Sequence, residues 1–264
     1  MPAKALGEEG FRWFLGVVED RDDPEKRGRV RVRVHGLHDS SEAVVPKATL
    51  PWAPVMLPAT SSSQKQVGVS ATGLQVGSTV FGFFVDGSET TMPIVMGSLP
   101  GKGDIPQLAS EKPSINKQKV GPEPDSPYSA KYPYNKVMQT EAGHVIEIDD
   151  TPNAERIHVY HKSGTYIEID QSGQRVNKIV GDDYEIVVKN KTVFIQGNLN
   201  IQVQGSVSLT APNITINGDT TIKGKLTVTE TITSQGNIEG NGVSLNTHVH
   251  GGVDPGSGTT SGPQ

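Results

Sequence analysis

The most constraining feature of this 264-residue chain is a ribbon of alternating side chains near its carboxyl end. From residue 198 to residue 224, Ile, Leu and Val alternate with polar residues, which is the two-residue period of strands with one covered face. Glycines divide the ribbon into short runs: Gly197 and Gly205 are eight residues apart, and Gly224 and Gly236 are twelve apart. A thin ribbon of short strands cannot cover its own apolar face.

The cover for this face must come from outside the ribbon. No aromatic residue follows Phe194, and no helical pattern lies nearby. A single-chain β-solenoid needs enough residues in each coil to wrap a core, and runs this short make only one side of a coil. We therefore predict an intertwined homotrimeric β-helix, or β-prism, over residues 137–246, in which two further copies cover each strand.

The amino-terminal part has a different character. Four strand candidates rich in Val and Phe lie between residues 11 and 100, bounded by Gly, Pro and Asp, and they predict a small closed barrel in residues 1–100. Seven prolines from Pro100 to Pro133 predict a linker over residues 101–136, too short for a catalytic domain. The fold class expected is all-β.

Composition excludes several partners and chemistries. The net charge of −5 argues against electrostatic attraction of the whole molecule to nucleic acid or anionic lipid. The absence of cysteine excludes disulfides and thiolate chemistry. The start MPAKALGEEG lacks the apolar core of a secretory signal, so we expect synthesis as a soluble product in the cytoplasm.

Two separated regions carry a family resemblance. EAGHVIEIDDTPNAERIHVYHKSGTYIEID (residues 141–170), followed by GDDYEIV (181–187), resembles the start of the trimeric β-helix in the central spike proteins of contractile-tailed bacteriophages. FLGVVEDRDDPEKRGRVRVRVHGLH (14–38), LPWAPVMLP (50–58) and GFFVDGSETTMPIVMGSLPG (82–101) look like the amino-terminal OB-fold barrel of the same spikes.

The resemblance implies a place and a task. The barrel would bind a trimeric hub protein in the tail baseplate of the virion, and the β-helix would pierce the host outer membrane when the sheath contracts. Some members insert a lysozyme domain between barrel and β-helix, and this chain departs from them because its linker is too short. We therefore expect no enzymatic activity. Whether a separate cap protein covers the tip stays open.

The sharpest local motif is THVHGG, where the strand repeats stop. His248 and His250 are two residues apart in an extended segment, so both imidazoles leave the same side. About a threefold axis they supply six nitrogens, which suit an octahedral divalent transition ion such as iron, with nickel, cobalt or zinc less favoured. The resemblance also points to iron. We predict a metal-binding tip over residues 247–264, against the alternative of two solvated histidines in a Gly-rich tail.

Three other groups have plainer interpretations. Arg29, Arg31 and Arg33 alternate with valines and resemble a strand that binds single-stranded nucleic acid, but without alternating aromatic residues a charged outer or hub-contacting face is favoured. Five carboxylates could suggest a glycosidase pair; they are Glu147, Asp149, Asp150, Glu168 and Asp170. All of these except Asp150 alternate with isoleucines, so we expect them to face outward instead. Three further histidines are expected at the surface or in turns: His144, His158 and His161.

Several functions remain as alternatives to a phage spike. Related spikes serve tailocins and type VI-like secretion machines, a cell-wall hydrolase or iron enzyme would use the carboxylates or the histidine pair, and a fibre would bind a host glycan. Six imidazoles leave no open coordination position for a substrate, and the low aromatic content of the carboxyl-terminal half disfavours sugar stacking.

Overall fold

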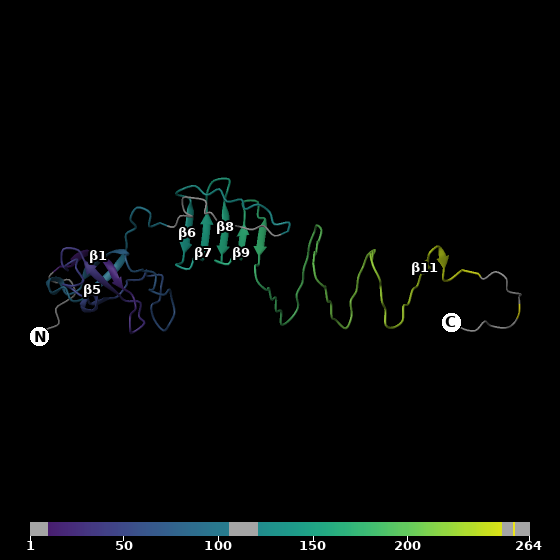
Figure 1. Cartoon of the computed structure of the whole chain (residues 1–264), viewed down its shortest axis with the longest axis horizontal. Helices are drawn as coiled ribbons and strands as arrows, with labels where there is room; N and C mark the ends of the chain where they lie inside the picture. The colour runs from purple at the N-terminus through teal and green to yellow at the C-terminus, as the bar shows by residue number, and fades with distance from the viewer. Residues whose placement is uncertain (1–9, 106–120, 250–255, 257–264) are drawn as a thin grey trace. The chain divides into compact units, whose positions relative to one another are not determined.

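The computed structural model describes residues 10–105, 121–249 and 256. In this described part the regular elements are β-strands and two short 3-10 helices, without any α-helix, so the all-β prediction is confirmed. The chain divides into two units, Met1–Asn190 and Lys191–Gln264 (Figure 1). Among the described residues, no helix has the length and apolar character needed to cross a membrane.

The first sheet contains five antiparallel strands in the order β3-β2-β1-β4-β5. The strands are β1 (Arg12–Asp20), β2 (Val30–Val34), β3 (Trp52–Ala53), β4 (Thr79–Phe84) and β5 (Pro93–Ser98), with η1 (Lys47–Thr49) and η2 (Gly87–Glu89) in the connections. The segment after β3 returns to the opposite edge, where Val55 pairs with Val95. The sheet therefore closes into the small barrel that the sequence predicted.

The barrel core is formed by the valines that alternate with the arginines of β2. Val30, Val32 and Val34 are buried against Phe14 and Phe84, together with residues of β1, β4 and β5. The sequence pattern predicted this inward face correctly, because a strand sends successive side chains to opposite sides.

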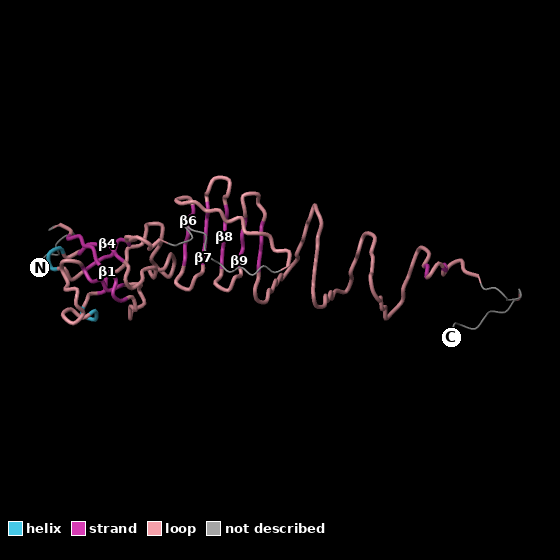
Figure 2. The backbone as a smooth tube through the Cα atoms, turned by 45° about the horizontal axis from the view of Figure 1, so that its top comes forward, coloured by secondary structure: helices cyan, strands magenta, loops and turns pink. Residues whose placement is uncertain are grey.

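The second sheet is a five-stranded antiparallel meander in the order β10-β9-β8-β7-β6. Its strands are β6 (Asn135–Gln139), β7 (Val145–Asp149), β8 (Arg156–Tyr160), β9 (Tyr166–Ile169) and β10 (Arg175–Lys178). Turns with Gly at positive φ join three of these hairpins, at Gly143, Gly164 and Gly173. Each strand pairs with the next along the chain, as Figures 1 and 2 show.

The described residues of the second unit contain very little regular structure. Two short strands, β11 (Glu239–Gly240) and β12 (Val243–Ser244), form a hairpin. In the described chain no strand lies between β10 and β11, and residues 191–238 form a zigzag of extended runs (Figure 2). In the described part of this unit, the large aliphatic side chains and Phe194 are between 40% and 91% exposed. The alternation predicted strands here, and a single chain does not form them because none of its own segments lies alongside to pair with it.

Candidate functional site

One face of the second sheet is apolar and uncovered. Its members, which we call the isoleucine face, are Met138, Ile146, Ile148, Ile157, Val159, Ile167 and Ile169. All except the half-buried Ile169 are between 43% and 60% exposed. Monomeric soluble proteins rarely expose a contiguous apolar patch of this kind, so the face marks a surface for a partner.

The strand register arranges these side chains in two rows across the sheet. Ile146 lies opposite Val159, which lies opposite Ile167. Ile148 lies opposite Ile157, and Ile157 lies opposite Ile169. Directly opposed side chains in an antiparallel sheet contact one another, so each row is a continuous apolar ridge.

The opposite face of the same sheet is polar and buried. Its centre, which we call the buried polar cluster, consists of Asn135, Glu147, Arg156, His158 and Glu168. Arg156 lies between two carboxylates, with Nη2 2.6 Å from Glu147 Oε1 and Nη1 2.7 Å from Glu168 Oε2. His158 Nδ1 lies 3.1 Å from Glu147 Oε2, and Asn135 Nδ2 donates to Glu147 Oε1 over 2.7 Å.

A segment of the same chain covers this cluster. Residues 121–134, which we call the strap, run against the polar face. Four sets of contacts hold it: Glu123 with Tyr166 and Lys178, Ser126 with Glu168, the Tyr128 ring with Arg156, and the Lys131 amide with Thr151. This part of the predicted linker is therefore packed structure. Of the rest of that linker, residues 101–105 are described, residues 135 and 136 begin β6, and residues 106–120 lie outside the described residues.

These contacts overturn the prediction for the carboxylates. Glu147, Asp149 and Glu168 were expected to face outward, and His158 was expected at the surface, but all four are buried. Alternation showed that the two faces differ, yet it could not show which face the strap covers. Asp150 and Asp170 do lie at the sheet margin, where Asp150 pairs with Lys136 and Asp170 accepts hydrogen bonds from its own turn.

The charges in the cluster are stabilised by one another. Burial alone would raise the pKa of Glu147, but the hydrogen bond with His158 and the charge of Arg156 outweigh burial and lower it. The phenol of Tyr166 shows the reverse, since burial and the hydrogen bond to Glu123 raise its pKa. Because the two central carboxylates share a guanidinium and lie beneath the strap, the arrangement resembles a structural ion network and not an acid and nucleophile flanking an open cleft.

The other two histidines lie where the sequence placed them. His144 and His161 belong to turns, their rings are 4.5 Å apart, and His161 bonds to Ser163 within its own turn. In the described residues no group of three or more metal-ligating side chains is present.

The three arginines that alternate with the valines in and before β2 already have partners within the barrel. Arg29 pairs with Asp23 at 2.6 Å and Arg33 pairs with Glu19 at 2.8 Å, while Arg31 lies 4.6 Å from the centre of the Trp52 ring. These contacts leave little positive charge for a phosphate backbone, and they disfavour nucleic-acid binding. The expectation of a charged outer face does not hold for Arg33, whose side chain is buried.

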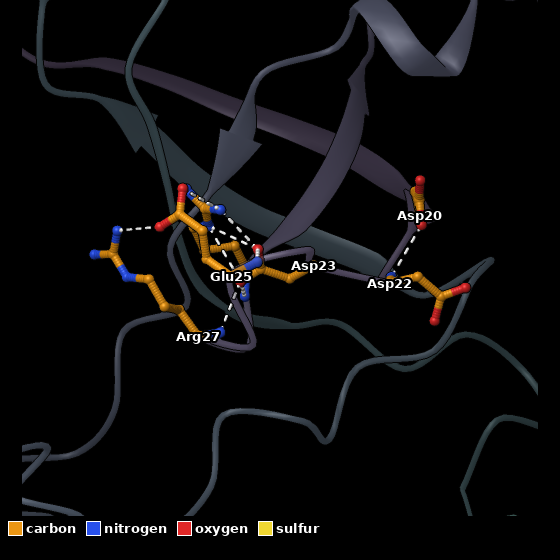
Figure 3. Close-up of polar contacts among 6 residues, drawn as sticks. Asp20, Asp22, Asp23, Glu25 and Arg27 are labelled. Carbon is orange, nitrogen blue, oxygen red and sulfur yellow. Dashed lines mark hydrogen bonds and ion pairs between the residues drawn. The ribbon is translucent and has the colours of Figure 1, made fainter.

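The turn before β2 explains the fixed position of Arg29. Asp23 accepts hydrogen bonds from the backbone amides of Glu25 and Arg27 at 3.0 and 2.8 Å, as Figure 3 shows. The ion pair with Arg29 lowers the pKa of Asp23 well below its ordinary value. The carboxylate therefore organises the turn and holds Arg29, the residue just before β2.

An aromatic surface on the barrel was missed by the sequence reasoning. Phe11, Trp13 and Leu15 are about half exposed, and Trp13 stacks on Phe81 with ring centres 5.3 Å apart. Phe83 lies edge-on to Trp13 at 5.5 Å. We call these five residues the aromatic patch. The signal was present in FRWFLG, where Phe11, Trp13 and Leu15 alternate with Phe14, which belongs to the core.

Of the two predicted metal ligands, the structure describes one. His248 follows β12, and its Nδ1 lies 3.0 Å from the carbonyl oxygen of Ser244 and 3.2 Å from that of Leu245. An Nδ1–H that donates to a carbonyl leaves the lone pair on Nε2, which is the tautomer of many metal-binding histidines. His250 and most of the predicted tip lie outside the described residues.

Comparison with known proteins finds two family matches. Residues 35–185, which run from the end of β2 past β10, match the family described as the Gp5 N-terminal OB domain. Residues 242–264 match the GpV Apex motif, and this range includes both histidines of THVHGG.

Two curated relatives agree with these matches. Protein Gp5 of Vibrio phage KVP40 is 34% identical over 277 residues, covering 77% of this chain and 66% of that protein. The pre-baseplate central spike protein Gp5 of Enterobacteria phage T4 is 43% identical over 109 residues, covering 39% of this chain and 18% of that protein. The matched part is thus less than two thirds of either relative. Since the OB-domain match alone spans more than half of the chain, the chain belongs to the Gp5 family of phage baseplate central spike proteins.

Proposed function

We propose that this chain forms the membrane-piercing spike at the centre of a contractile tail baseplate, as a homotrimer that crosses the host outer membrane when the sheath contracts. The observation that carries the proposal is the reversed burial of the second sheet. Its charged face is covered by its own strap, whereas its isoleucine face is open to solvent. Two further copies of the same chain would supply the missing cover.

The ribbon that follows extends the same argument. Its aliphatic residues are exposed in one chain and have no strand partners in the described part. Winding with two copies would pair the backbone amides and carbonyls and cover the apolar side chains at once. Bending such a needle requires many contacts to break together. Stiffness is then the property that the machine uses.

The barrel is the part that we assign to the baseplate. The aromatic patch gives it an exposed apolar surface rich in Trp and Phe, the residue types enriched at protein interfaces. We propose that the trimeric hub protein binds there. The cluster of carboxylates carries no catalytic role in this proposal, because the strap and Arg156 already occupy it.

At the tip, we propose that His248 and His250 of three chains hold one iron ion. The tautomer supported by the Ser244 carbonyl fits ligation through Nε2 of His248. The Apex motif match supports a specialised end at this position. The ion supplies a cross-link between chains, and the residues around it close the blunt end of the core.

Native mass spectrometry with metal analysis of the freshly purified full-length protein tests this proposal. We expect three chains and about one metal ion per particle. His248→Ala and His250→Ala are expected to lose the metal and keep the trimer, whereas the control His35→Ala, at an exposed barrel position, keeps both. A stable folded monomer would refute the spike, and a metal-free trimer would refute only the tip.

A further inference from the structure

We infer that the isoleucine face is the surface at which three copies first associate, and that this contact sets the register from which residues 191–246 wind. The inference rests on the proposed trimer. It goes beyond that proposal by naming the nucleating surface and the direction of assembly, from the second sheet toward the tip.

The first argument is that the sheet is already ordered in one chain. Strands β6 to β10 pair in a single continuous register, and the strap and buried polar cluster fix the face behind them. A partner that meets this sheet does not have to order its backbone first. Association with a preformed surface avoids most of the conformational entropy that disordered segments lose on binding.

The second argument is the stiffness of the side chains on this face. Ile and Val are branched at Cβ and have few χ1 rotamers in a strand. The two rows place Ile148 beside Ile157 and Ile146 beside Val159 at directly opposed positions. Each chain therefore presents a ridged surface of defined shape, which another copy can match in one register.

The ribbon lacks the preformed order of the sheet, although it is also rich in Ile and Val. In the described part, residues 181–238 contain no strand, so each strand pair would have to form together with its partners. A segment that must order its backbone and form its contacts in the same step is a poor nucleus for association. The two-residue alternation also leaves the register open, since a slip of two residues keeps every apolar side chain on the covered side. Unequal glycine spacing opposes such a slip only after several strands have formed.

The occupant of the isoleucine face follows from continuity along the chain. The row Ile148–Ile157–Ile169 has a charged residue at each end, Lys136 on β6 and Arg175 on β10. The other row runs from Met138 on β6 to Asn177 on β10, so the apolar surface has a limited width. Directly after β10 the uncovered alternation resumes and continues through the ribbon. The two copies that wind around the ribbon would therefore also cover the isoleucine face, and no other partner is needed.

Paired conservative substitutions test the order of assembly. Ile157→Val shortens one side chain of the isoleucine face by a single carbon, and Ile214→Val makes the same change in the ribbon. The two side chains have similar exposures in one chain, 50% and 57%. The full-length protein is unfolded, diluted at several concentrations, and followed by the appearance of trimer. We expect Ile157→Val to slow association by about tenfold and to change the dissociation rate less than about twofold. We expect Ile214→Val to change the association rate less than about twofold and to speed dissociation by about tenfold.

A second pair keeps the test decisive if the conservative changes are too mild. Ile157→Asp is expected to give a chain with a folded barrel, reported by Trp13 and Trp52, that does not associate. Ile214→Asp is expected to associate and then remain incomplete toward the tip. Slower association with Ile214→Val or His248→Ala and an unchanged rate with Ile157→Val would overturn the inference while leaving the trimer intact. A chain that never forms trimers refutes the proposed function instead.

Discussion

Replacing Arg156 with Met removes the guanidinium that bridges Glu147 and Glu168 in the buried polar cluster. The side chains of all three residues are at most 3% exposed. Breaking a buried ion network by removing one partner costs about 3–5 kcal/mol of folding free energy, because an uncompensated charge stays buried. Here two carboxylates lose their shared cation, so we expect the upper part of that range.

Lys136→Met is the matched control. Lys136 pairs with Asp150 on the same sheet, but their side chains are 67% and 54% exposed. Exposed pairs contribute about 0–1 kcal/mol, since water screens both charges. The two variants delete one cation each, and they differ in the burial of the carboxylates left behind.

Hydrogen exchange of peptides from β7 and β8 is the appropriate measurement. Both tryptophans, Trp13 and Trp52, lie in the barrel and do not report on this sheet. If these amides exchange through opening of the sheet, 3–5 kcal/mol corresponds to exchange about 150 to 5,000 times faster. Exchange in Lys136→Met should change less than about sixfold.

A third variant separates charge from packing. Adding Glu147→Gln and Glu168→Gln to Arg156→Met removes the orphaned charges, and we expect it to restore at least half of the lost protection. If Arg156→Met exchanges no faster than Lys136→Met, the cluster is solvated in the assembled protein, and the burial argument fails.

Two further predictions concern pH and the barrel. The folded-state pKa of Glu147 lies below its ordinary value of 4.5, so its contribution to stability is present above about pH 4.5 and is lost as the pH falls through the lowered pKa. Hydrogen exchange of β7 amides from pH 7 to pH 3 should show this loss of stability. A Glu147→Gln variant with the same pH profile would contradict the prediction. Gly82→Ala would place Cβ 2.1 Å from the Ile94 carbonyl oxygen and 2.6 Å from Phe14 Cζ, so the backbone must shift at a cost of about 1–3 kcal/mol or more. Thermal unfolding followed by tryptophan fluorescence should show a lower midpoint than that of Gly97→Ala, whose Cβ meets nothing within 4 Å, and equal midpoints would show that the barrel accommodates the methyl group.

Much of the fold could be predicted from local patterns. The alternation of Val30, Val32 and Val34 with arginines identified the inward face of β2, and the apolar period after Phe194 identified a ribbon that needs partners. The motif THVHGG named the tip histidines, and its metal stays a prediction. The inference for β2 succeeds because a strand's own geometry links sequence period to side-chain direction.

The sequence by itself determined that β6 to β10 have two unlike faces, one with Ile146 and Ile157 and one with Glu147 and His158. Only the tertiary structure decided which of them the chain covers. Period two distinguishes the sides of a strand without saying which side is inside, and the answer depends on the strap, whose Ser126 and Tyr128 contact strands about 30–40 residues further along. The strap supplies hydrogen bonds and a ring to the charged side, and so the isoleucines remain on the surface that a second copy can reach.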